Sequence, residues 1–238
     1  MRSAVIASLL LAFAIVAAGQ KPASTSGGVF SRIATPIWGG HTGLVVPSPD
    51  GRKAIVVRSP RNSGSDPIPD VVVTMDNREY ETEIGGWVNA EAAWSPDSAA
   101  FFVTYSDGGV IGTYHVKVVY VADSGLRIVE PVPNGRSLFV PTCFDPEVPN
   151  VGAIRWSRRD PSRLLIAVEV PPHSSCASMG TFRAFEISLP DAGLRSRYGQ
   201  IKAKKLFGSY LGHELAAADD DCIRNPGTCV PNGMKMQK

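Results

Sequence analysis

Few side chains in this 238-residue chain have a type and a setting that suit binding or catalysis. His41 lies in the glycine-rich stretch 39–43, where glycines would let the backbone approach a ligand closely, although such a stretch is more often only a loop. Asp145 and Asp160 carry carboxyl groups, which can act as general acid and general base in hydrolysis. Their spacing, however, does not distinguish them from the other acidic residues of the chain. We take His41, Asp145 and Asp160 as candidate binding residues.

The usual catalytic signatures are missing from the sequence. It contains no Gly-x-Ser-x-Gly motif, and its four histidines show no i, i+4 pair of the kind that holds zinc. Asp219, Asp220 and Asp221 offer carboxylates for calcium, but a calcium loop alternates its ligands around a turn glycine, which favours a solvated acidic run instead. The sequence therefore predicts no catalytic residue, no metal site and no cofactor.

Charge and composition narrow the class of protein. Lys and Arg total 24 and Asp and Glu total 22, which gives a formal net charge of +2. The basic residues look scattered apart from the stretch 202–205, whereas a nucleic-acid binder gathers them on one face, so we expect no nucleic-acid partner. With 44% hydrophobic and 19% charged residues a disordered chain is excluded, and the length allows one sizeable domain or two small ones.

The N-terminus reads as a targeting signal. Arg2 precedes an apolar stretch, and small residues at 17–19 offer a cleavage site, so residues 1–19 are predicted to be a signal peptide and residues 20–28 a flexible leader. A membrane anchor is the alternative, but the apolar stretch is shorter than the ~20 residues that cross a bilayer. Since no other segment reads as a membrane span, we expect a periplasmic or secreted protein.

Export makes disulfides the first interpretation of the four cysteines. Cys222 and Cys229 flank an Asn-Pro-Gly turn signal, which predicts a bond between them, and a bond between Cys143 and Cys176 follows by elimination. A metal site is the alternative, but it lacks both the Cys-x-x-Cys spacing and a nearby histidine pair.

A repeated pattern of strands and turns provides the elements that must position these residues. Copies lie at residues 45–57, 92–104 and, more weakly, 153–168. Each copy runs a strand into Ser-Pro-Asp-Gly or a variant, where proline presets φ and the aspartate or serine bonds the local backbone, and an apolar strand then returns. Further strands follow each copy, so that roughly 45 residues hold four strands, the size of one propeller blade. The equivalent serines are Ser48, Ser95 and Ser157.

The sequence of the second copy resembles the TolB-type β-propeller repeat. Trp94-Ser95-Pro96-Asp97, the strand 101–104 and the strand end 118–125 are similar to its W-S-P-D-G, strand, I-Y-x-x-D-x-x-x-G pattern. The first copy has Val46-Pro47 where Trp is usual, the second has Ser98 for Gly, and the third has Arg158-Arg159 in place of Pro and its neighbour. The α/β domain that precedes the propeller in TolB itself is absent, so the resemblance implies a fold and no particular function.

These patterns predict an all-β fold with one C-terminal helix: a partial or small β-propeller of about three four-stranded blades. The propeller-like domain covers residues 29–198 with an insertion at 134–150, and 199–238 form the helix and a disulfide-looped tail. Residues 29–44 could add strands of a fourth blade. The helix and the insertion are expected to cover open sheet edges, with partner binding as the alternative. The apolar face of the helix comprises Ala203, Phe207, Tyr210, Leu211 and Leu215.

Two functions fit these expectations. The repeat and the missing catalytic set favour an exported, non-catalytic binding or scaffold protein, whose propeller loops or sheet edge contact a protein or a component of the cell envelope. The alternative is an extracytoplasmic hydrolase of peptide or glycan, with a site built from loops near residues 39–43 and 145–160.

Overall fold

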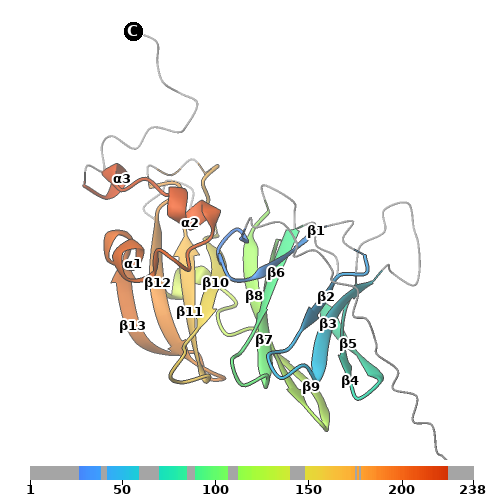
Figure 1. The fold of residues 1–238 in the computed structure, drawn as a ribbon. Coiled ribbons are helices and arrows are strands. Elements are labelled where there is room, and N and C mark those ends of the chain that lie inside the picture. Colours follow the sequence, from blue (N-terminus) through green and yellow to red (C-terminus); the bar gives the residue numbers. More distant parts are fainter. Residues whose placement is uncertain are drawn as a thin grey trace, which may run out of the picture.

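The structure is a computed structural model that describes residues 27–38, 42–58, 70–84, 89–106, 112–139, 148–174, 176 and 178–224. In this part of the chain, thirteen strands form three antiparallel sheets (Figure 1). Sheet 1 contains β2 (Val45–Pro47), β3 (Lys53–Arg58), β4 (Asp70–Met75) and β5 (Arg78–Ile84). Sheet 2 contains β1 (Thr35–Trp38), β6 (Asn89–Trp94), β7 (Ala100–Ser106), β8 (Tyr114–Ala122) and β9 (Gly125–Val129). Sheet 3 contains β10 (Asn150–Trp156), β11 (Arg163–Glu169), β12 (Phe182–Ser188) and β13 (Gly193–Gly199).

The three sheets lie side by side with sheet 2 in the middle (Figure 1). One apolar cluster fills the space between sheets 1 and 2, and a second fills the space between sheets 2 and 3. Phe101 belongs to the first cluster and its neighbour Phe102 to the second, and neither is exposed. A strand covered on both faces buries the residues of both faces, which explains the continuous apolar run at positions 100–103 of β7.

Two tryptophans join successive sheets at equivalent positions of the repeat. Trp94 of sheet 2 donates its indole N–H to the carbonyl of Val46 in sheet 1, at 3.0 Å. Trp156 of sheet 3 donates in the same way to Ala93 of sheet 2, also at 3.0 Å. Val46 and Ala93 both lie two residues before the repeat serine. The first copy has Pro47 at the tryptophan position, and no sheet precedes sheet 1 among the described residues, so an indole there would have no such carbonyl to bond.

The turns of the first two copies follow the predicted chemistry. Ser48 Oγ donates to Asp50 at 2.6 Å, and Ser95 Oγ donates to Asp97 at 2.6 Å. Ser98 has φ +60, a conformation that usually calls for glycine. Serine replaces the usual glycine of the repeat here, and its side chain makes a contact that glycine could not. Its Oγ accepts from the backbone N–H of Asp50 at 3.1 Å and so links two turns.

The segment before the first copy adds a strand to sheet 2, whereas the sequence had left open that it could contribute strands of a fourth blade. β1 pairs antiparallel with β6, with Thr35 opposite Ala92 and Trp38 opposite Asn89. It therefore becomes the fifth strand of sheet 2. The pairing joins residues about 50 positions apart, which no local pattern could have indicated.

The expected C-terminal helix is present but interrupted. It comprises α1 (Gln200–Phe207), followed by α2 (His213–Ala217) and α3 (Asp221–Arg224). Between α1 and α2 the backbone turns to pair with the N-terminal segment, since Arg32 N–H donates to the Tyr210 carbonyl at 2.9 Å and Gly212 N–H donates to the Phe30 carbonyl at 2.8 Å. These bonds, made outside the helix, end the regular helical pattern. The insertion also holds a short 3-10 helix, η2 (Gly135–Ser137).

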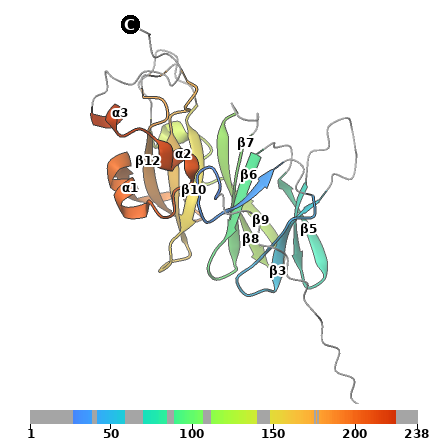
Figure 2. The same ribbon diagram turned by 45° about the horizontal axis from the view of Figure 1, so that its top comes forward.

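The helices cover a face of sheet 3 and not a sheet edge as expected. Leu164 and Ile166 of β11 point toward sheet 2, while Leu165 and Ala167 lie in a third cluster with the helices. Figures 1 and 2 show α1 and α2 beside sheet 3, where α1 contacts β12 and β13. The residues of the predicted apolar face that are buried in this cluster are Ala203, Leu211 and Leu215. No helix in the described part of the chain is long and apolar enough to cross a membrane.

Candidate functional site

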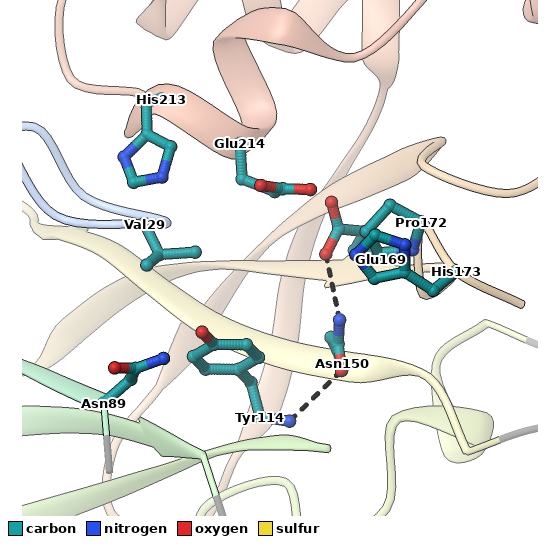
Figure 3. A pocket seen from close by; sticks show the side chains of 9 residues that line it. All are labelled: Val29, Asn89, Tyr114, Asn150, Glu169, Pro172, His173, His213 and Glu214. Atoms are coloured by element: carbon teal, nitrogen blue, oxygen red, sulfur yellow. Dashed lines mark hydrogen bonds between the residues drawn. The ribbon is translucent and has the colours of Figure 1, made fainter. Parts of the chain in front are cut away.

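A cavity of about 230 Å³ opens where sheets 2 and 3 meet the N-terminal segment and α2 (Figure 3). Strand register explains why its residues gather there. Asn89 and Tyr114 begin β6 and β8 and both pair with Ser106, while Asn150 of β10 pairs with Glu169 of β11. The lining residues are Val29, Asn89, Tyr114, Asn150, Glu169, Pro172, His173, His213 and Glu214.

Glu169 is the central polar group of this pocket. Its side chain is buried, with 1% of the residue exposed, and its Oε2 accepts from Asn150 Nδ2 at 3.1 Å. Its Oε1 accepts no hydrogen bond from the described residues. Figure 3 shows this oxygen directed away from Asn150, on the side of Glu214. Burial raises the pKa of Glu169 to about 8, and the Glu214 carboxylate adds to the rise, so Glu169 keeps its proton at neutral pH.

Asn150 fixes the geometry of the pocket floor. Its amide oxygen accepts from the Tyr114 backbone N–H at 3.1 Å while its amide nitrogen donates to Glu169. It thereby ties sheet 2 to sheet 3. Burial raises the pKa of Tyr114, and its ring packs edge-on against Phe30 with centroids 5.1 Å apart.

The N-terminal segment holds α2 above the pocket. His213 N–H donates to the Gly28 carbonyl at 3.2 Å, and Glu214 N–H donates to the Val29 carbonyl at 3.1 Å. The ring Nδ1 of His213 lies 3.1 Å from the same Gly28 oxygen. Glu214 is thus placed across the cavity from Glu169. Among the described lining residues there is no Lys or Arg to balance these two carboxyl groups.

A second buried carboxyl group, that of Glu91, holds the N-terminal segment in place through hydrogen bonds. It accepts from the Ser31 N–H at 3.0 Å and from the Phe30 N–H at 3.2 Å. Gly28 passes so close that an added Cβ would lie 1.8 Å from Glu91 Oε2. Burial raises the pKa of Glu91 to about 8 although these N–H groups oppose the rise. Glu91 is therefore a structural group beside the pocket and not part of its lining.

These two carboxyl groups should make stability fall as pH rises. Each has a pKa near 8 when folded and about 4.5 when unfolded, so between pH 5 and 8 the folded state holds more protons than the unfolded state. We expect the free energy of unfolding, measured with urea, to fall by about 1–3 kcal/mol per pH unit across this window. The double variant Glu91→Gln/Glu169→Gln should show a flatter profile. Parallel profiles for the two proteins would contradict this assignment.

Of the three sequence-based candidates, the structure describes only Asp160. His41 and Asp145 lie outside the described residues. Asp160 lies in the turn between β10 and β11, at the opposite end of these strands from Glu169. There it accepts from Ser162 Oγ at 2.5 Å and from Arg163 Nε at 2.7 Å, and the Ser162 hydrogen bond is the main cause that lowers its pKa. These contacts account for Asp160 as a turn residue.

The cysteines and the acidic run are placed only in part. Cys176 is disulfide-bonded and 1% exposed. Cys143, Cys229 and the side chain of Cys222 lie outside the described part of the chain, so the pairing stays a prediction. In the acidic run, Asp220 accepts from Gln200 Nε2 at 2.8 Å. No group of three metal-binding side chains occurs within the described residues.

Sequence reasoning missed the pocket because its residues come from six separate segments. One signal was available. Glu169 stands between Val168 and Val170 in a run that is otherwise apolar, and an acidic residue in a strand buried on both faces needs an explanation. Asn89, Tyr114 and Glu214 carry no comparable signal.

Comparisons with known proteins add no assignment. A scan against protein-family models matches none of them, and a search of the curated proteins finds no significant relative. The resemblance to the TolB-type repeat therefore stays an expectation.

Proposed function

We propose that this chain is an exported binding protein whose pocket holds a small polyhydroxylated ligand, such as one sugar residue of a cell-envelope glycan. The observation that carries the proposal is the unpartnered Oε1 of Glu169, buried in a pocket opposite Glu214. A buried polar atom without a partner costs free energy, and a ligand that bonds it recovers that cost.

The chemistry of the lining selects for hydroxyl groups. Protonated Glu169 can donate, the Glu214 carboxylate can accept, and the amide of Asn150 can do both, while a sugar hydroxyl both donates and accepts. The Glu214 carboxylate has no balancing Lys or Arg among the described lining residues, which disfavours an anionic ligand. The volume of about 230 Å³ lies below the usual range for drug-sized ligands and suits a single ring.

The architecture proposed for this protein is a partial β-propeller of three blades, one for each sheet. Support comes from the two equivalent indole bonds of Trp94 and Trp156, and from the helices that cover the outer face of sheet 3 where a next blade would pack. Repeat proteins need such a terminal cap to protect the last apolar face. The disulfide of Cys176 supports export, since structural disulfides persist outside the cytoplasm.

Titration calorimetry with neutral mono- and disaccharides tests the pocket. Glu169→Leu should weaken binding at least tenfold, because it removes the donor and keeps most of the volume. Glu91→Gln is the matched control, since it alters a buried carboxyl group that does not line the pocket, and it should bind as the wild type does. Equal affinity of Glu169→Leu and wild type would refute the proposal, provided that circular dichroism shows both variants to be folded at the temperature of the titration.

A hydrolase is the second candidate, and one observation favours it. A protonated carboxyl group facing a second carboxylate is the arrangement that glycosidases use for acid catalysis. In that case a bound oligosaccharide would be cleaved, and Glu169→Gln would lower the rate at least a hundredfold. Recovery of the intact oligosaccharide after prolonged incubation with the wild-type protein would rule this candidate out.

A further inference from the structure

A second concave site lies on the outer face of sheet 3. It is a groove of about 380 Å³ at the end of β10 and β11 opposite to the Glu169 pocket. All four strands contribute to it, and Phe207 at the end of α1 forms one side. The lining residues are Arg155, Ser157, Arg158, Arg159, Leu165, Glu186, Tyr198 and Phe207.

The groove belongs to the most basic part of the chain. Residues 150–210 contain ten Lys or Arg and four Asp or Glu, whereas the remainder contains more acidic than basic residues. The basic residues are therefore concentrated in sheet 3 and α1 and are not scattered, as the sequence alone had indicated. A concentration of positive charge around a groove attracts anionic ligands.

Aromatic rings hold the arginines in place. The guanidinium of Arg155 lies 4.5 Å from the ring centroid of Tyr210 and 5.7 Å from that of Phe207, and Arg158 lies 5.6 Å from Tyr210. Stacking engages the face of a guanidinium and leaves its N–H edge available. Arg155 Nε is buried and has no hydrogen-bond acceptor among the described residues. The site thus has a preorganised donor without a partner.

Glu186 limits which anion fits. This half-buried carboxylate lines the same groove as the three arginines, and its nearest cation is Arg163, at 4.0 Å. A ligand made only of phosphate groups would be repelled by it, whereas a ligand that also carries hydroxyl donors would bond it. Tyr198 and Phe207 add aromatic surface on which a sugar ring can lie.

We propose that this groove binds an acidic saccharide, a sugar that carries a carboxylate. The carboxylate of the saccharide pairs with Arg155, Arg158 and Arg159. The hydroxyl groups of the saccharide donate to Glu186 and bond Ser157, and its sugar ring packs against Tyr198 or Phe207. Binding here does not depend on the Glu169 pocket, so Glu169→Leu should leave it unchanged.

The probe is an oligogalacturonate, titrated at low salt into the full chain. The double variant Arg158→Ala/Arg159→Ala should weaken binding at least tenfold, because each arginine contributes a charge-assisted hydrogen bond. The matched control is Arg195→Ala/Arg197→Ala, which removes the same charge from β13 outside the groove and should change the affinity less than threefold. Equal losses in the two double variants would show attraction by net charge alone and would overturn the proposal.

Glu186→Gln separates a saccharide from other polyanions. If Glu186 accepts sugar hydroxyls, this variant should bind oligogalacturonate at least threefold more weakly. If the groove is a general anion site, removing the negative charge should strengthen binding instead, and the proposal is then wrong. Competition by polyglutamate or by single-stranded DNA as effective as unlabelled oligogalacturonate would also overturn it in favour of an acidic peptide or a nucleic acid.

Discussion

Gly152→Ala should destabilise the protein by about 3 kcal/mol or more, although it adds a single methyl group. A Cβ at this position would lie 2.0 Å from Cγ of Phe30, and real atoms do not approach so closely. Phe30 has no exposed surface and packs in the third cluster with Tyr114 and Ile154, so its ring has no space into which it can move. The methyl group therefore displaces the segment that carries Phe30 and removes its burial.

A double-variant cycle tests this mechanism. Phe30→Ala alone should cost about 3–5 kcal/mol, the usual range for a buried phenylalanine. Once Phe30 is gone the clash is gone, so adding Gly152→Ala to Phe30→Ala should cost little more. Gly199→Ala is the control, since nothing lies within 4 Å of a Cβ there, and it should stay within about 1 kcal/mol of wild type. Additive costs of Gly152→Ala and Phe30→Ala in urea unfolding would refute the proposed contact.

Trp156→Ala should cost about 3–5 kcal/mol, because it opens a cavity between sheets 2 and 3 and removes an indole donor. Trp156 is 4% exposed, its ring centroid lies 6.2 Å from that of Phe102, and its N–H is the bond to the Ala93 carbonyl. Trp156→Phe keeps an aromatic ring but leaves the part-buried Ala93 carbonyl without this donor, so about 1–3 kcal/mol of the loss should remain.

The repeat provides the control for this prediction. Trp94 makes the equivalent bond between sheets 1 and 2, so Trp94→Phe should lower the free energy of unfolding by a similar amount. Urea unfolding of the single and double Phe variants measures both costs. A Trp156→Phe protein within 0.5 kcal/mol of wild type would show that the indole N–H does not contribute to the contact between the sheets.

Local signals predicted the parts of the fold that depend on neighbouring residues. The turn at Ser48 depends on a hydrogen bond to Asp50, only two positions away, and the apolar run around Phe101 indicated a buried strand. The path of β1 depends on pairing with β6, which only the folded chain provides. The break between α1 and α2 has the same origin, since the bonds that replace the helix come from Phe30 and Arg32.

The candidate site was less predictable than the fold for a similar reason. The Glu169 pocket requires Val29, Tyr114 and Glu214, which are far apart in sequence and ordinary in type. The role of Asn150 rests on one amide that reaches two strands at once, and a sequence cannot show this. Arg158 and Arg159 of the groove were visible in the sequence as a departure of the third copy from the repeat, but the Tyr210 ring that contacts Arg158 belongs to a later segment.

The contacts between the N-terminal segment and α2 set the order in which the pocket can form. His213 bonds Gly28 across 185 positions of sequence, and both neighbourhoods line or border the cavity. Sheets 1 and 2 do not include residues 213 and 214, whereas the pocket is complete only when α2 packs against the N-terminal segment. Contacts with so large a sequence separation are the slowest to close. The ligand binding proposed for this pocket therefore requires that α2 has docked on the N-terminal segment.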